Sequence, residues 1–318
     1  MRLDKLLQSV ICIILILALS GCSGAVNKTD SPPESVSDLE RSDAEHETEP
    51  QFMRTLFFER NSFLSATMSP NKYESNGKLI GGIVPHHLLA SDMIAGFFSM
   101  ASDQSENFDT VLLISTSHFP ENTGSLVVTS TLDWKTPYGN VKNNRGISQE
   151  FIENSAIDAE NNWQAVEADH GVAGLVPFVK YYLPDADIAT LMIANNLDRF
   201  KLDSLSDEIA QICENKRVLL VASIDFSHYL FPDQAAVKDV ETVAAIDAMD
   251  MGKIVGFGDG NLDSPQTMGV FLKLLQKSGG KIDQLDHSTS PDKLPYEITN
   301  PIFSEGITTY FVYAIWEE

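Results

Sequence analysis

The sequence predicts an α/β fold in which a central, largely buried mixed sheet is flanked by helices. Short apolar runs alternate along the chain with longer segments whose apolar residues recur every three or four positions, which is the order of strands and helices in such folds. After about residue 50 there is no internal repeat and no second change of composition. We therefore expect a single domain over residues 51–318.

The predicted elements follow one another from residue 79 to the C-terminus. Buried strands are expected where apolar residues run without interruption: residues 79–84, 110–114, 188–193, 217–222 and 306–316. Helices are expected at residues 88–100, 171–182, 202–213, 232–249 and 265–277. Pro232 and Pro265 each stand at the start of a helix, a position that suits proline. Residues 125–130 are a candidate for an added antiparallel strand.

The N-terminus has the features of an export signal. Two basic residues, Arg2 and Lys5, precede an apolar run over residues 10–19, and the small residues Ser20 and Gly21 follow it directly. This run is shorter than the roughly 20 residues that a membrane-spanning helix needs, so residues 1–21 are expected to be a signal peptide. Residues 19–22, Leu-Ser-Gly-Cys, resemble a bacterial lipobox, which implies lipidation of Cys22. The alternative is an ordinary secretory peptide with an incidental cysteine.

The segment after the signal is polar and acidic. Residues 28–49 contain eight Asp or Glu against Lys28 and Arg41, a net charge of 2 minus 8, or -6. Such a segment cannot bury a core. We expect residues 22–50 to form a lipidated, disordered tether that holds an exported domain near the outer side of the membrane.

Composition excludes several classes of function. The chain has 318 residues with 45 acids and 22 bases, a formal charge of -23, and this excludes a nucleic-acid-binding role because a polyanion would be repelled. Three cysteines cannot build a disulfide scaffold or a four-cysteine zinc site. No phosphate-binding loop, dinucleotide fingerprint or serine-hydrolase motif is present. Any metal is therefore expected on histidines and carboxylates.

Polar residues gather just beyond the ends of the predicted strands. Five of the seven histidines stand at or near such places: His86, His87, His118, His170 and His228. Asp225 follows the strand that ends near Ala222, and Asp263 comes shortly before a predicted helix. Any one of these residues has a simpler explanation as a loop or capping residue. Together they predict a functional site, because ligands of α/β sheets bind at the carboxyl ends of the strands.

Five short motifs resemble those of the Memo-like proteins, a family that includes the AmmeMemoRadiSam system protein B. They are Gly-Ile-Val-Pro-His at 82–86, Ile-Ser-Thr-Ser-His at 114–118, Thr-Pro-Tyr-Gly at 136–139, Glu-Ala-Asp-His at 167–170 and Ser-Ile-Asp-Phe-Ser-His at 223–228. The resemblance runs from about residue 52 to the C-terminus. It implies the fold of the class III extradiol ring-cleaving dioxygenases, an α/β sandwich with a metal pocket at one end of the sheet.

The resemblance also implies a set of site residues. In the family, two histidines and a cysteine line the metal pocket, and these two histidines correspond to His86 and His118. An aspartate and a third histidine stand nearby in the family, and they correspond to Asp225 and His228. The cysteine is missing. When Met-Gly-Val-Phe-Leu at 268–272 is aligned with the family's late helix, Asp263 takes its place. The alternative for Asp263 is a capping role at the helix beginning near Pro265.

Two histidines and one carboxylate are the ligand set of non-haem iron(II) enzymes that activate dioxygen. With the ligands that the resemblance implies, we expect a divalent metal, with iron(II) favoured over copper or zinc. The expected activity is that of a dioxygenase-like oxidoreductase, in which His228 or His170 is an acid or base for a small-molecule substrate. Two alternatives stay open: a non-catalytic metal- or ligand-binding lipoprotein, which includes a module for a protein partner, and an inert scaffold. Whether AMMECR-type and radical-SAM proteins are partners is also open.

Overall fold

The computed structural model describes residues 51–294 and 306–317. The predicted signal peptide, the tether and the lipidation site Cys22 lie outside the described residues. Within those two ranges, no helix has the length and apolar character needed to cross a membrane.

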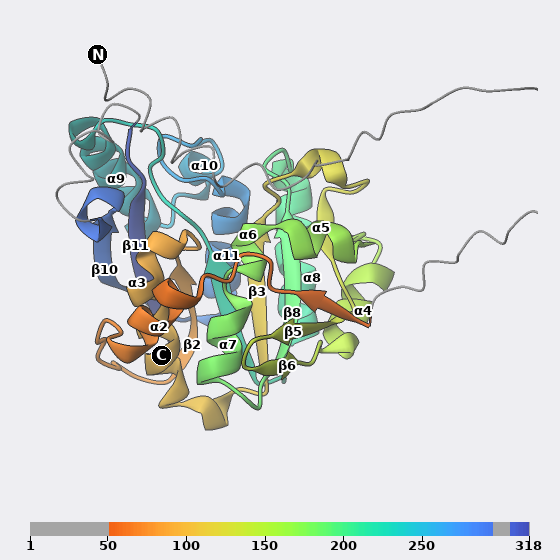
Figure 1. Cartoon of the computed structure of the whole chain (residues 1–318). Helices are drawn as coiled ribbons and strands as arrows, with labels where there is room; N and C mark the ends of the chain where they lie inside the picture. Colours follow the sequence, from red (N-terminus) through yellow and green to blue (C-terminus); the bar gives the residue numbers. More distant parts are fainter. Residues whose placement is uncertain (1–50, 295–305, 318) are drawn as a thin grey trace, which may run out of the picture. The chain divides into compact units, whose positions relative to one another are not determined.

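An eight-stranded mixed sheet forms the centre of the fold (Figure 1). Its strands stand in the order β10-β11-β2-β9-β3-β8-β4-β7. In chain order they are β2 (Leu79–Val84), β3 (Thr110–Thr116), β4 (Val127–Thr129), β7 (Glu160–Asn161), β8 (Asp187–Ile193), β9 (Val218–Ser223), β10 (Lys281–Thr289) and β11 (Thr309–Trp316). The five predicted strands and the added antiparallel strand are all present, so the predicted α/β class is confirmed.

The middle of the sheet is parallel. β2 pairs with β9, β9 with β3, and β3 with β8, all in the same direction. Every residue of β3 is buried, which explains why this strand appears in the sequence as a continuous apolar run. Because these four strands are parallel, their carboxyl ends lie at the same edge of the sheet, where the loops containing His86, His118 and Asp225 begin.

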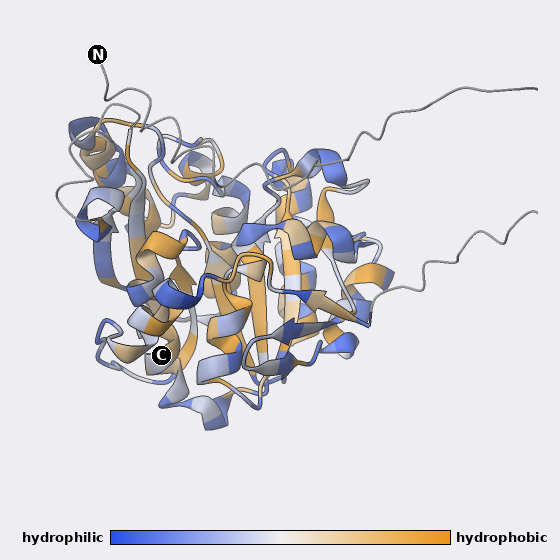
Figure 2. Cartoon of the chain, viewed as in Figure 1, coloured by the Kyte–Doolittle hydropathy of each residue, from blue (hydrophilic) through white to orange (hydrophobic). Residues whose placement is uncertain are grey.

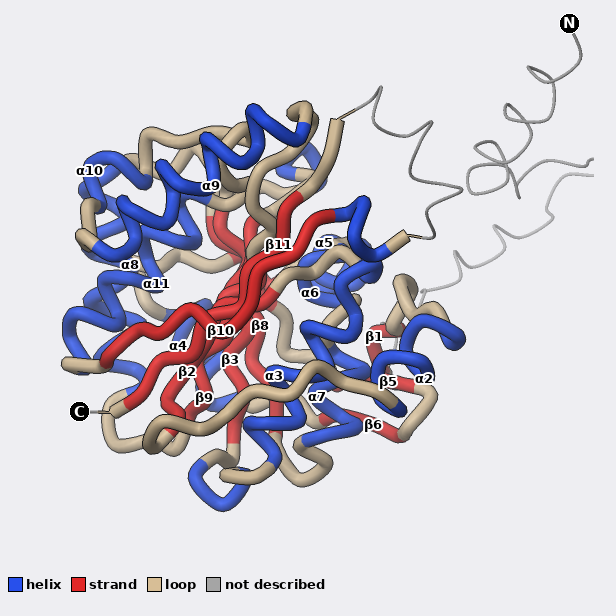
Figure 3. The backbone as a smooth tube through the Cα atoms, turned by 90° about the vertical axis from the view of Figure 1, so that its left-hand side faces the viewer, coloured by secondary structure: helices blue, strands red, loops and turns tan. Residues whose placement is uncertain are grey.

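Helices cover both faces of this sheet (Figure 3). One layer contains α3 (Ser91–Ser102), α5 (Trp163–Ala168), α6 (His170–Ala173) and α7 (Val176–Tyr182), and the other contains α4 (Arg145–Glu153), α8 (Arg199–Cys213), α9 (Pro232–Asp247), α10 (Met251–Ile254) and α11 (Pro265–Ser278). Figure 2 shows that the central strands are mainly hydrophobic. At Gly82 a side chain would collide with the ring of Phe97, so glycine lets α3 pack closely on β2.

The N-terminal part of the described chain adds a small sheet and a helix. The order in this sheet is β1-β5-β6, from β1 (Phe52–Arg54), β5 (Asp133–Thr136) and β6 (Gly139–Val141). α2 (Arg60–Met68) packs against α3. Arg54 of β1 pairs with buried Glu167, with 2.6 Å between Nη2 and Oε1, and so links β1 to the segment that leads to His170.

Two of the predicted helices are not single regular helices in the structure. The helix expected over residues 171–182 is broken into α6 and α7, because Pro177 lacks the N–H that would bond to the carbonyl of Ala173. The helix expected over residues 88–100 begins with a 3₁₀ turn, Leu88–Ala90, before α3.

Candidate metal centre

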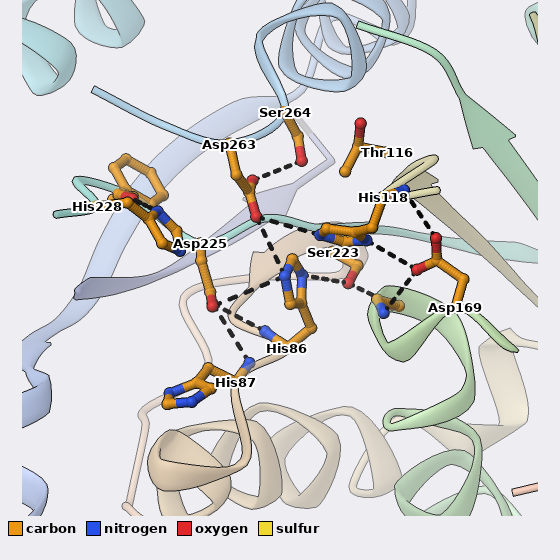
Figure 4. Close-up of polar contacts among 12 residues, drawn as sticks. His86, His87, Thr116, His118, Asp169, Ser223, Asp225, His228, Asp263 and Ser264 are labelled. Atoms are coloured by element: carbon orange, nitrogen blue, oxygen red, sulfur yellow. Dashed lines mark hydrogen bonds and ion pairs between the residues drawn. The ribbon is translucent and has the colours of Figure 1, made fainter. Parts of the chain in front are cut away.

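Four side chains from separate parts of the sequence meet at the carboxyl edge of the sheet (Figure 4). His86 lies two residues beyond β2, His118 two residues beyond β3, and Asp225 two residues beyond β9. Asp263 comes from the loop before α11, and its backbone N–H donates to the carbonyl of Asp225. The structure therefore brings together the three predicted metal ligands, His86, His118 and Asp263, and places Asp225 beside them.

The three predicted ligands point their donor atoms at one another. Asp263 Oδ2 lies 3.1 Å from His86 Nε2 and 3.6 Å from His118 Nε2. Among the described residues, the buried atoms His118 Nε2 and Asp263 Oδ2 have no hydrogen-bond partner. Atoms that bind one ion at about 2.1 Å lie about 3.0–3.5 Å apart. The spacing and the missing hydrogen bonds both fit a divalent metal ion.

Two groups of three possible ligands share His86, and each contains part of the predicted set. In each group the ligand atoms all lie within 4.8 Å of one another; one joins His86 with His118 and His170, and the other joins His86 with Asp225 and Asp263. The centre is open to solvent past two of its side chains, since His118 is 16% and Asp263 12% exposed.

Both histidines of the predicted ligand set have a partner on the ring nitrogen that points away from the centre. Asp169 Oδ1 lies 2.8 Å from Nδ1 of His118, and Ser223 Oγ lies 3.1 Å from Nδ1 of His86. Because an ionised carboxylate only accepts, Nδ1 of His118 carries the proton and Nε2 is left for the centre. Asp169 and Ser223 were not singled out as site residues from the sequence. Their only signal there is their place inside the motifs at 167–170 and 223–228.

The charges of the centre shift its pKa values strongly. Burial lowers the pKa of His118, but the hydrogen bond of Asp169 and the negative charges of Asp169 and Asp263 outweigh burial and raise it to about 10. Burial raises the pKa of Asp263, yet the charge of His86 and the close approach of His118 hold it well below its usual range. The ionised carboxylate thus needs a positive partner, which is a proton on the imidazoles or a metal ion.

Asp225 contacts the loop after β2 through both carboxylate oxygens. Its Oδ1 accepts the backbone N–H of His86 at 3.0 Å, and its Oδ2 lies 3.7 Å from Nε2 of His86. Only 2% of the residue is exposed. Asp225 therefore fixes the turn after β2 and also presents an oxygen to the metal centre.

Asp263 does not cap α11. The N-cap residue is Ser264, and no side-chain hydrogen bond caps this helix. Asp263 Oδ1 instead accepts the hydroxyl of Ser264 at 2.5 Å, which leaves Oδ2 directed at the two histidines. The capping alternative considered from the sequence is therefore wrong.

The two predicted acid or base residues occupy different places. The ring of His170 lies against that of His118, with 3.9 Å between centroids, and burial together with the charges of His118 and His86 lowers the pKa of His170 to about 3. His228 stands on the Asp225 side of the centre (Figure 4) and donates from Nδ1 to the carbonyl of Phe226 at 2.6 Å. No hydrogen bond joins His228 to the three predicted ligands within the described part of the chain.

Comparisons with known proteins agree with the motifs. A family profile described as Memo-like protein matches residues 57–296. The chain is 24% identical over 241 residues to the MEMO1 family protein TV1383 of Thermoplasma volcanium, covering 73% of this chain and 87% of that protein. It is 25% identical over 222 residues to a MEMO1 family protein of Desulfurococcus amylolyticus, covering 67% and 77%.

Among solved structures, the fold is similar to that of the uncharacterized protein JW3007 from Escherichia coli K12, with a TM-score of 0.49 and 12% identity over 74% of this chain and 99% of that chain. The family match covers most of the chain and includes all five motifs, with the predicted site residues His86, His118, His170, Asp225 and His228, together with Asp263. The chain therefore belongs to the Memo-like protein family.

Proposed function

We propose that this protein binds one divalent metal ion through His86, His118 and Asp263, and that it is an iron(II)-dependent, dioxygenase-like oxidoreductase. The convergence of two imidazole nitrogens and one carboxylate oxygen, without hydrogen bonds between them, supports the metal site most directly. The proposed ligand set contains no thiolate, so soft copper(I) loses its usual advantage.

The protein residues have distinct roles in this proposal. His86, His118 and Asp263 would hold the ion, which would supply the chemistry that activates dioxygen toward a small-molecule substrate. His170 is neutral at pH 7, because its pKa is lowered to about 3, and its ring is suited to orient a ligand by a hydrogen bond rather than to hold a proton. His228 donates from Nδ1 to a backbone carbonyl, which leaves Nε2 as the proton-accepting position.

Metal analysis of the full-length chain tests this proposal. The protein is purified in mild detergent without chelators and is analysed before and after anaerobic reconstitution with iron(II). We expect about one ion per chain, and loss of that ion in His86→Ala. His287→Ala is the matched control, because His287 lies in β10 outside the centre. Equal metal content in His86→Ala and the unchanged chain would contradict the metal site. A protein that is fully loaded with iron(II) but consumes no oxygen with phenolic or other small substrates would favour the non-catalytic alternative.

We also propose that Cys22 attaches the exported protein to the membrane through lipid. The charged start, the short apolar run and Leu-Ser-Gly-Cys at 19–22 support it. Cys22→Ala is expected to move the protein from the membrane pellet to the soluble fraction and to remove an acyl mass from its N-terminus. Cys12→Ala is the control and should leave both unchanged, because Cys12 belongs to the signal peptide. A membrane-bound Cys22→Ala protein, together with no acyl mass on the unchanged chain, would refute the anchor.

A further inference from the structure

One glycine contacts the partners of both ligand histidines. Gly171, the second residue of α6, is buried against the ends of β3 and β9, beside Ser115 and Ser223. Its backbone N–H donates to Asp169 Oδ1 at 2.9 Å, and its carbonyl accepts the hydroxyl of Ser223 at 2.5 Å. Asp169 holds His118 and Ser223 holds His86 (Figure 4), and the backbone of Gly171 joins these two partners.

These hydrogen bonds fix which nitrogen of each imidazole carries the proton. A carbonyl only accepts, so the single hydroxyl hydrogen of Ser223 points at Gly171. Ser223 Oγ can then only accept from His86, which places the proton on Nδ1 and leaves Nε2 free. Asp169 receives the Gly171 N–H and the His118 Nδ1 on one oxygen, and the backbone N–H of His118 on the other at 2.8 Å. Both imidazoles therefore present Nε2 to the centre.

The space at residue 171 explains why it has no side chain. A Cβ added there would collide with Ser115 Oγ, and it would lie 2.9 Å from His118 Cε1 and 3.1 Å from Asp169 Oδ1. Cε1 is the ring carbon between the two nitrogens of His118. A methyl group would thus push the imidazole away from both Asp169 and the centre.

We propose that Gly171 is a positioning residue for the metal centre: its N–H and carbonyl hold Asp169 and Ser223, and through them set the orientation and the metal-binding tautomer of His118 and His86. This inference rests on the proposed metal-binding function. The N–H and carbonyl of Gly171 bond to Asp169 and Ser223, and through these two residues Gly171 orients the histidines. Partners of this kind are typically worth 10- to 100-fold in metal affinity.

Cobalt(II) titration of the full-length chain tests the proposal, because the visible spectrum of cobalt(II) reports ligand geometry. Gly171→Ala is expected to weaken cobalt(II) binding on the order of 10- to 100-fold and to change the spectrum of the bound ion. Gly146→Ala is the matched control, since Gly146 is also the second residue of a helix and an added Cβ would lie 3.4 Å from its nearest neighbour, Asn144 Oδ1. It should bind cobalt(II) as the unchanged chain does.

A second variant keeps the test decisive if Gly171→Ala does not fold. Ser223→Ala removes only the hydroxyl between Gly171 and His86, and we expect about 10-fold weaker binding with an unchanged circular dichroism spectrum. Ser115→Ala is its control, because the neighbouring hydroxyl of Ser115 has no hydrogen-bond partner in the described structure. Binding within twofold of the unchanged chain in Ser223→Ala and in any folded Gly171→Ala would overturn the positioning role. Absence of cobalt(II) binding in the unchanged chain would instead refute the proposed metal function.

Discussion

Asp263→Asn is expected to lower the affinity of the chain for iron(II) or zinc(II) on the order of 100-fold or more, because it removes the carboxylate that faces both ligand histidines. Asparagine keeps the size of the side chain and an oxygen for the Ser264 hydroxyl, so the loop before α11 should keep its fold. Competition with a chromophoric chelator gives the affinity, and circular dichroism verifies the fold.

Two further variants show whether Asp263 is the carboxylate that binds the metal. Asp225→Asn keeps an oxygen for the His86 N–H and changes a group 3.7 Å from only one of the histidines, so its effect should be smaller. Full metal content in Asp263→Asn, with loss in Asp225→Asn, would transfer the ligand role to Asp225. Asp263→Cys should bind metal again and shift preference toward copper(I), because soft metals gain most from a thiolate.

The sequence predicted the parts of the fold that are buried on both faces. β2 occupies residues 79–84, as expected from its uninterrupted apolar run, and β3 and β8 extend the predicted strands only at their ends. β10 gave no such signal, because it lies at the edge of the sheet and its residues are half-buried or exposed. Its pairing with β11 depends on contacts that no local pattern encodes.

Site residues at strand ends could be predicted for a similar reason. The carboxyl ends of β2, β3 and β9 meet because the strands are parallel, and this places His86, His118 and Asp225 together. The roles of Asp169, Ser223 and Gly171 could not be predicted, because each depends on the direction of a hydrogen bond between segments that lie far apart in the chain. The sequence indicated Asp263 only through the pattern Met-Gly-Val-Phe-Leu in α11. The folded loop is needed to show that Oδ2 of Asp263 faces the histidines and does not cap the helix.

Metal affinity is expected to rise about tenfold per pH unit between pH 6 and pH 8 for each proton that the metal displaces. The pKa of His118 is raised to about 10 by Asp169 and Asp263 despite the opposing effect of burial, so in the metal-free chain His118 is protonated throughout this range. A metal ion needs the lone pair on Nε2 and must release that proton. The pKa of His86 is also raised, mainly by the charges of Asp225 and Asp263 acting against burial, so a second released proton would make the dependence steeper.

The sign follows from competition between proton and metal for the same nitrogen. Below about pH 10, which is the pKa of His118, a proton occupies Nε2 of this residue. Each rise of one pH unit makes that proton about tenfold easier for a metal ion to displace. Zinc(II) titrations at pH 6, 7 and 8, corrected for protonation of the competing chelator, measure the slope, and calorimetry in buffers of different ionisation enthalpy counts the protons released. Asp169→Asn should flatten the slope, because it removes a charge that raises the pKa of His118. A metal affinity that is constant from pH 6 to 8 would contradict this prediction. It would mean that Nε2 of His118 carries no proton in the metal-free chain, although Asp263 faces it.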